Sequence, residues 1–253
     1  MHESSLCVAA IQSASIPGDV SANVARHVHL VEIAAQQGAD VIVFPELSLT
    51  GYEPTGAAEN AVLAFDSVLT PLQTAADRCD VLINVGVPLR SQEAKPFLAS
   101  LVFRPTDHVA VYRKRFLHPG EEQAFSAGDS VCVVPFAEEA VGVAICADIN
   151  HANHARDLAH DGATMIIAGV AMTPGGIQDA ETVMAKHARQ HQLVAAMANY
   201  AQPTGGYEMA GRSAIWAPTG RLIAQADGGG EAMVLAERSA ETWAGSVVPV
   251  HGR

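Results

Sequence analysis

Short runs of apolar, often β-branched residues recur along the whole chain, and segments with helical spacing separate many of them. Runs of about four to eight such residues are typical of strands. Many of these runs are apolar on both faces, which predicts sheets that are covered on both sides. We therefore expect an α/β fold, with strands at 6–12, 40–45, 81–88, 98–103, 109–113, 141–146, 164–170, 193–200, 213–216, 222–225 and 232–236.

The intervening segments have the periodicity of helices. In residues 19–37, apolar side chains recur at helical spacing, and the pattern stops at Gly38, a residue type that commonly follows a helix. Similar patterns predict helices near 58–76, 152–159 and 179–191. The sequence has no glycine-rich phosphate loop, so we expect no nucleotide cofactor.

Length and charge limit the class of protein. The 253 residues show no linker or charge block, so we expect one domain over 1–253, with the last ~15 residues as a C-terminal tail. Lys and Arg number 15 against 27 Asp and Glu, and the net charge of -12 disfavours nucleic acid and anionic membranes as partners. The sequence has no export signal and no apolar run near the ~20 residues that span a bilayer, so we expect a cytoplasmic protein. Its four cysteines are widely spaced, which fits reduced thiols.

Three segments each place a reactive side chain at the end of an expected strand. Glu46 follows the apolar run VIVFP, where ligand clefts of α/β proteins open. Burial there would raise its pKa towards that of a useful base, although a surface carboxylate that begins a loop fits the same pattern. In VYRKRF, strand alternation puts Lys114 on the face of Tyr112 and away from Arg113. An inward ammonium needs anionic partners, which Glu46 or Glu121 would supply, and it would then stabilise an oxyanion.

The third segment runs the strand VGVAI into Cys146, shortly before an expected helix. A thiol at a strand-to-helix turn lies near free backbone N–H groups, which favour a thiolate and a bound oxyanion. Simple packing of a buried cysteine is the alternative interpretation. Cys7, Cys79 and Cys132 lack a comparable setting.

In the order Glu, Lys, Cys, the three segments resemble the catalytic motifs of the nitrilase superfamily of carbon–nitrogen hydrolases. The resemblance covers almost the whole chain and rests on FPELSLTGY, YRKRFLHPGEEQAFSAGD, GVAICADI and the closing stretch NYAQPTGGYEMAGRSAIWAPTGRLIA. It implies a four-layer α-β-β-α sandwich with two mostly antiparallel sheets packed face to face. It also implies a homodimer or larger assembly, with helical faces at 155–159 and 183–193 as candidate contacts.

The resemblance assigns Cys146 as the nucleophile, Glu46 as the general base and Lys114 as the oxyanion stabiliser. Glu121 matches the additional glutamate of the family, and the adjacent Glu122 stays open as an alternative. These groups would hydrolyse a carbon–nitrogen bond other than a peptide bond, most readily that of a small aliphatic amide, through a thioester. Nitriles and N-carbamoyl compounds are alternative substrates, and no cofactor or metal is implied.

Five residues are candidates for substrate binding: Tyr52, His118, Met172, Asn150 and Ala147, whose N–H would help to hold the oxyanion. Many family members carry an arginine where Asn150 stands. Arginine is the bidentate clamp for carboxylates, so its replacement favours a neutral or amine-bearing substrate over an N-carbamoyl amino acid or a dicarboxylic acid amide.

Three other interpretations are open. His187 and His191, four residues apart on an expected helix, fit a zinc site, although the HExxH motif is absent. His151 or His154 would be the base of a cysteine–histidine hydrolase, although the short turn back to Cys146 disfavours that pairing. A non-enzymatic scaffold or binding protein of the same fold is the third interpretation, and the intact set of reactive residues argues against it.

Overall fold

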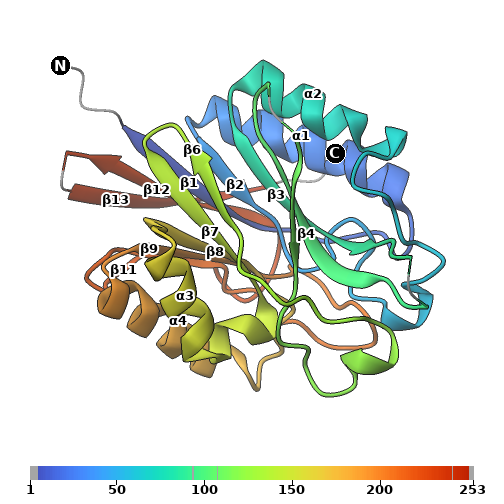
Figure 1. Cartoon of the computed structure of the whole chain (residues 1–253). Helices are drawn as coiled ribbons and strands as arrows, with labels where there is room; N and C mark the ends of the chain where they lie inside the picture. The colour runs from blue at the N-terminus through green and yellow to red at the C-terminus, as the bar shows by residue number, and fades with distance from the viewer. Residues whose placement is uncertain (1–4, 93, 107, 241, 251–253) are drawn as a thin grey trace.

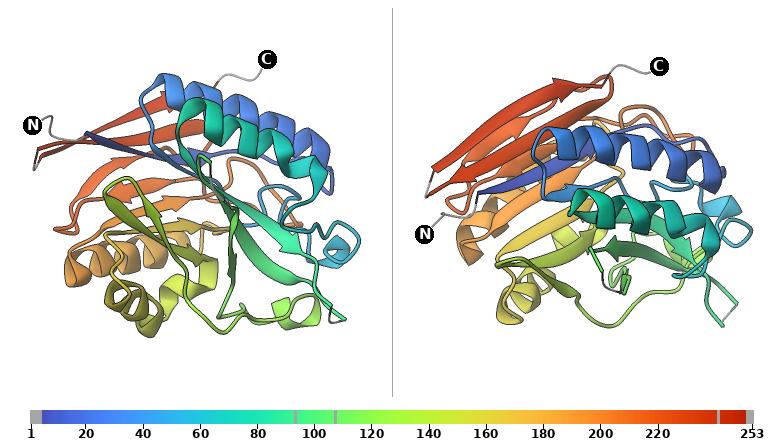
Figure 2. Two further views of the ribbon diagram at one scale, coloured as in Figure 1. Left: turned by 45° about the horizontal axis from the view of Figure 1, so that its top comes forward. Right: turned by 90° about the horizontal axis from the view of Figure 1, so that it is seen from above.

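The structure is a computed structural model that describes residues 5–92, 94–106, 108–240 and 242–250. Within these ranges the strands form two sheets that pack face to face, and helices cover the outer face of each sheet (Figures 1 and 2). One pair of helices lies on one side and a second pair lies on the other. The expected four-layer sandwich is confirmed. The helices are α1 (Val20–Gln36) and α2 (Thr70–Cys79) on the first sheet, and α3 (Ala152–His160) and α4 (Ile177–His191) on the second.

Among the described residues, the first sheet has seven strands in the order β13-β12-β1-β2-β3-β4-β5. Strands β1, β2 and β3 run parallel, and antiparallel pairs extend the sheet on both sides. Apolar side chains between this sheet and α1 and α2 form one core cluster. The strands are β1 (Leu6–Gln12), β2 (Val41–Val43), β3 (Leu82–Leu89), β4 (Phe97–Phe103), β5 (Ala110–Arg113), β12 (Ala232–Ser239) and β13 (Thr242–Pro249).

The second sheet, counted over the same residues, has six strands in the order β11-β10-β9-β8-β7-β6. Strands β7, β8 and β9 are parallel because α3 and α4 serve as the crossovers between them, whereas the outer pairs are antiparallel. The central strands of both sheets are therefore parallel, whereas mostly antiparallel sheets were expected. The strands are β6 (Val133–Phe136), β7 (Glu139–Ile145), β8 (Met165–Gly169), β9 (Val194–Ala198), β10 (Ala214–Trp216) and β11 (Leu222–Gln225).

The helix expected at 58–76 begins only at Thr70 and ends at Cys79. Pro71 explains the late start, because a proline inside a helix removes a backbone hydrogen bond, whereas in the first turn its missing N–H is not needed. Turns and two 3₁₀ helices, Pro54–Gly56 and Ser67–Leu69, occupy the preceding stretch.

Two strands were not expected from the sequence. Strand β6 contains Pro135, a residue that central strands exclude, but β6 lies at the edge of its sheet, where proline is tolerated. Strand β13 falls in the stretch expected to be a C-terminal tail, and it pairs with β12 along its whole length. Most of its side chains are exposed, so it lacks the apolar pattern that identifies a buried strand.

Candidate active site

Glu46 lies in a segment held between the two sheets. Residues 44–47 follow β2 and pass between Gly86 of β3 and Gly169 at the end of β8. A Cβ on Gly86 would lie 2.1 Å from the nearest main-chain atom of this segment, and a Cβ on Gly169 would lie 2.6 Å from it. Neither position accepts a side chain unless the segment moves. The Tyr200 hydroxyl donates a 2.7 Å hydrogen bond to the Glu46 carbonyl, so both sheets fix where this side chain emerges.

Lys114 follows β5 directly and is fully buried. Its neighbours have the predicted alternation, because Tyr112 is buried and Arg113 is exposed. The Lys114 ammonium donates to Glu46 Oε1 at 2.6 Å, and to Glu121 Oε1 and Oε2 at 2.9 and 2.8 Å. Both carboxylates considered from the sequence therefore contact the same cation.

Glu121, rather than the adjacent Glu122, is the second carboxylate of this cluster. It is buried, and besides Lys114 it accepts hydrogen bonds from the Tyr52 hydroxyl and the His118 N–H, both at 2.8 Å. Glu122 is exposed, and its carboxylate accepts from the N–H of Gly120. One buried carboxylate thus joins three groups: the Lys114 ammonium, the Tyr52 hydroxyl and the His118 N–H.

The charges of this cluster are set by burial and by each other. Burial raises the pKa of Glu46 to about 7, and the positive charge of Lys114 only partly opposes that effect. Burial alone lowers the pKa of Lys114, but the negative charges of Glu46 and Glu121 outweigh it and raise the pKa, so the ammonium keeps its proton. Glu46 Oε2 is buried and has no hydrogen-bond partner among the described residues. This carboxylate can therefore exchange a proton near neutral pH.

Cys146 ends β7 and begins the 3₁₀ helix η4 (Cys146–Asn150). Its φ of 44° lies in the left-handed region, which costs about 1–3 kcal/mol for a residue with a side chain. The buried carboxylate of Asp148 holds this turn by accepting from the Ile145 N–H at 2.9 Å and the Tyr112 hydroxyl at 2.7 Å. Burial and the charge of Glu46 raise the pKa of the Cys146 thiol, so a base must take its proton before the sulfur can act as a nucleophile.

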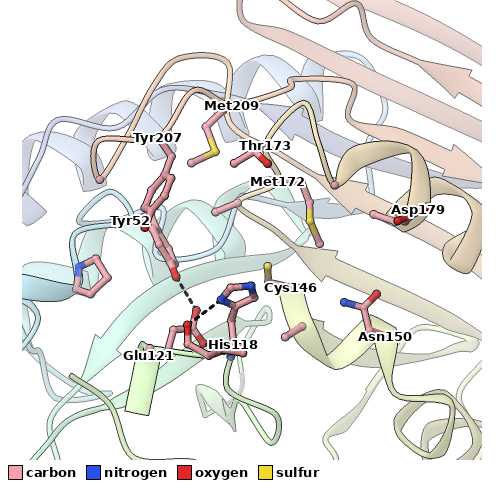
Figure 3. Close-up of a pocket in the computed structure, with 18 of the residues that line it drawn as sticks. Tyr52, His118, Glu121, Cys146, Asn150, Met172, Thr173, Asp179, Tyr207 and Met209 are labelled. Carbon is pink, nitrogen blue, oxygen red and sulfur yellow. Dashed lines mark hydrogen bonds between the residues drawn. The ribbon is translucent and has the colours of Figure 1, made fainter. Parts of the chain in front are cut away.

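Cys146 lines a cavity of about 730 Å³, a volume typical of small-molecule sites (Figure 3). Glu121 also lines the cavity, whereas Glu46 and Lys114 do not and contact it only through their neighbours. Glu46 and Lys114 therefore lie behind the residues that face the cavity, next to Glu121. All five expected substrate-binding residues line the cavity: Tyr52, His118, Ala147, Asn150 and Met172.

The sequence did not single out four further lining residues, which Figure 3 labels as Thr173, Asp179, Tyr207 and Met209. They come from the segment after β8, the first turn of α4 and the segment after β9. Strand and helix periodicity does not predict how such connecting segments fold. Their position after strands of the second sheet was the only available signal, because ligand sites of α/β proteins gather at strand ends.

The sequence model of the carbon–nitrogen hydrolase family matches residues 7–245. The chain belongs to this family. An (R)-stereoselective amidase from Pseudomonas sp. is 32% identical over 221 residues, which are 85% of this chain and 79% of that protein. An omega-amidase from Xenopus laevis is 28% identical over 228 residues, which are 85% of this chain and 82% of that protein.

A solved structure of the same fold is that of an amidase from Nesterenkonia sp., a double mutant in complex with acrylamide. It aligns with a TM-score of 0.86 at 20% identity and covers 95% of this chain and 93% of that one. The present chain is thus a carbon–nitrogen hydrolase of the nitrilase superfamily that acts on bonds other than peptide bonds.

The histidines of this carbon–nitrogen hydrolase make structural contacts around η4. Nε2 of His187 lies 2.7 Å from the Ile149 carbonyl oxygen, and Nε2 of His154 lies 3.1 Å from a carbonyl oxygen of β7. The His151 ring stacks on Phe116, with 3.8 Å between the ring centroids. Across the described ranges, no three His, Cys, Asp or Glu side chains are placed to hold a metal ion. No helix in the same ranges has the length and apolar character to span a bilayer.

Proposed function

We propose that this chain hydrolyses small amides through a thioester on Cys146, with Glu46 as the general base and Lys114 as the oxyanion stabiliser. One observation carries the proposal. The Cys146 thiol lines a ligand-sized cavity and lies near enough to Glu46 and Lys114 for their charges to act on it, and those two groups are hydrogen-bonded to each other. A nucleophile, a base and a cation are therefore gathered beside one cavity.

In the first half of the reaction, the Glu46 carboxylate takes the thiol proton and the Cys146 sulfur attacks the amide carbonyl carbon. The C–O π electrons move onto oxygen, where the Lys114 ammonium and the N–H of Ala147 stabilise the negative charge. The C–N bond then breaks. The departing nitrogen takes the proton from Glu46 and leaves as ammonia or an amine, and a thioester remains.

In the second half, Glu46 takes a proton from water while the water oxygen attacks the thioester carbon. A second oxyanion forms at the same position, and the C–S bond breaks to release the carboxylic acid. The sulfur recovers its proton from Glu46, which restores the starting state. In this scheme Glu121 does not touch the reacting atoms, because its two oxygens hold the Lys114 ammonium in place.

The test is ammonia release from acetamide, propionamide and butyramide by wild type, Cys146→Ala and Cys132→Ala. Cys132 is half-buried and does not line the cavity, so Cys132→Ala makes the same chemical change, loss of a thiol, at a position away from the site. We expect turnover by wild type and Cys132→Ala, and none by Cys146→Ala with unchanged circular dichroism. Near-normal turnover by a folded Cys146→Ala variant would exclude the thioester, and hydrolysis of the matching nitriles in place of the amides would assign nitrilase chemistry. A wild type that hydrolyses neither series and forms no adduct at Cys146 would support the scaffold interpretation.

We also propose that the protein is cytoplasmic and, on the family resemblance, that it is a homodimer. The apolar residues of the two helices considered as contacts, such as Leu158 and Met184, are buried within the chain itself. A dimer would therefore use the exposed faces of these helices or another surface. Light scattering at micromolar concentration measures the mass directly, and a monomer mass would refute the dimer.

A further inference from the structure

The charged residues that line the cavity are acidic. Neither Lys nor Arg is among the described residues of the lining, which contains the carboxylates of Glu121 and Asp179. Both oxygens of Glu121 accept hydrogen bonds from the Lys114 ammonium, which is shared with Glu46, so the charge of Glu121 is compensated in part. In the part of the chain that the structure describes, Asp179 has no such cation beside it and offers its whole charge to a ligand.

Asp179 lies in the first turn of α4 and is exposed at the cavity. Its carboxylate makes no hydrogen bond or ion pair with the described residues. The arginine of this region, Arg212, is bound by Glu181, with Nε to Oε1 at 2.7 Å and a second nitrogen to Oε2 at 2.8 Å. A bidentate pair of this kind leaves Arg212 little capacity to neutralise Asp179.

The start of α4 also faces the cavity, and helix starts often bind anions. Here that role is disfavoured, because the N–H groups of Gly176 and Ile177 already donate to the Thr173 carbonyl at 3.0 and 3.2 Å. The carboxylate of Asp179 in the same turn would repel an anion. The α4 wall is therefore suited to a positive group and unsuited to a carboxylate.

The wall across from α4 is neutral. Tyr52 and Tyr207 meet edge to face there, with 6.4 Å between the ring centroids, and Figure 3 shows Cys146 between these tyrosines and Asp179. A substrate whose carbonyl reaches Cys146 can thus extend towards an aromatic wall or towards a carboxylate. The amide side chain of Asn150, near the same wall as Asp179, adds a neutral hydrogen-bonding group.

We infer that the preferred substrates are amides that carry a protonated amine, and that Asp179 is the specificity-determining residue that binds this ammonium group. The inference rests on the proposed function, since it concerns the substrate of the same cavity. The net charge of -12 acts in the same direction, because it attracts cations and repels carboxylates at long range.

Isosteric amides test this inference. Butyramide, 3-aminopropanamide and succinamate place a methyl, an ammonium and a carboxylate group at the same distance from the amide, and hexanamide with 5-aminopentanamide repeats the comparison at a longer reach. We expect wild type to favour the amino amide over its neutral isostere in kcat/KM by about 3- to 10-fold at one of the two lengths, as a partly exposed ion pair allows. Succinamate should be the poorest substrate. In Asp179→Asn the ratio of the amino amide to its neutral isostere should fall to about one.

Asp129→Asn is the matched control, because Asp129 is exposed, lies outside the cavity and loses the same charge. It should keep the wild-type ratio, which separates local binding by Asp179 from long-range attraction. The inference is wrong if Asp179→Asn keeps the full ratio, or if wild type hydrolyses the neutral amides and shows no preference at either length. If neither neutral nor amino amides are hydrolysed, the proposed function fails instead.

Discussion

The two sides of Cys146 are built in different ways. On one side Glu46, Lys114 and Glu121 are at most 3% exposed, and hydrogen bonds link all three. On the other side Asn150 and Asp179 are exposed, at the end of η4 and at the start of α4. A buried charge cannot lose its partner without a large cost, whereas an exposed side chain can be exchanged freely. The first side is thus suited to fixed chemistry and the second to variable specificity.

The largest effect is expected for Lys114→Met on the buried side of the site, because this substitution leaves the carboxylates of Glu46 and Glu121 without their shared cation. Removing one partner of a buried ion pair costs about 3–5 kcal/mol, so we expect a loss of that order in the free energy of unfolding. Turnover should fall by at least about 10²- to 10³-fold, because the proposed oxyanion donor is lost as well. Urea denaturation and amide hydrolysis measure the two effects. A stability change below about 1 kcal/mol would contradict the buried ion-pair network.

The second prediction concerns pH. Since burial raises the pKa of Glu46 to about 7, the carboxylate is protonated and cannot accept the thiol proton below that pH. We expect kcat/KM to rise with pH through about 7 and then to level off. Glu46→Gln should lower turnover by about 10²- to 10⁴-fold, since glutamine cannot act as a base.

The control for this profile is the exposed His151, one of the two histidines, with His154, that the cysteine–histidine interpretation considers as the base. If Glu46 is the base, His151→Gln should keep the position of the pH midpoint. A midpoint that disappears in His151→Gln and persists in Glu46→Gln would reverse the assignment.

The third prediction concerns the backbone beneath Glu46. In Gly86→Ala the new Cβ would overlap the 44–47 segment, so the carboxylate must shift from Lys114. Overpacking in a filled interior costs about 1–3 kcal/mol, and we expect a similar loss of stability together with reduced kcat. Gly229→Ala is the matched control, because nothing lies within 4 Å of the place that its new methyl group would take, and its φ is not positive. Equal behaviour of the two variants would show that the segment is not held by close packing.

The same contrast explains how far the sequence predicts this molecule. Glu46, Lys114 and Cys146 each lie at the end of an expected strand, but the order of the strands in a sheet does not follow from periodicity, so their convergence was expected from the family resemblance. Asp179 belongs to the first turn of α4, a helix that the sequence predicts, but helix periodicity does not show that this turn faces a cavity. Tyr207 belongs to a connecting segment whose course depends on tertiary contacts, which periodicity does not predict. The sequence did not predict strand β13 for a related reason, since a mostly exposed edge strand needs no apolar face. Local pattern predicts what is buried, and the cavity walls are only partly buried.

The smallest expected effect on stability is that of Asn150→Arg, on the exposed side of the comparison. Asn150 makes up part of the cavity wall and is exposed, so the free energy of unfolding should change by no more than about 0.5 kcal/mol. The new guanidinium would sit in a lining that otherwise has no Lys or Arg among the described residues. Because arginine binds carboxylates bidentately, the ratio of kcat/KM for succinamate over butyramide should rise by about 3- to 10-fold. If the ratio stays unchanged in a folded variant, the methyl or carboxylate end of the substrate does not lie near Asn150. A large loss of stability would contradict the division between a fixed side and a variable side of the site.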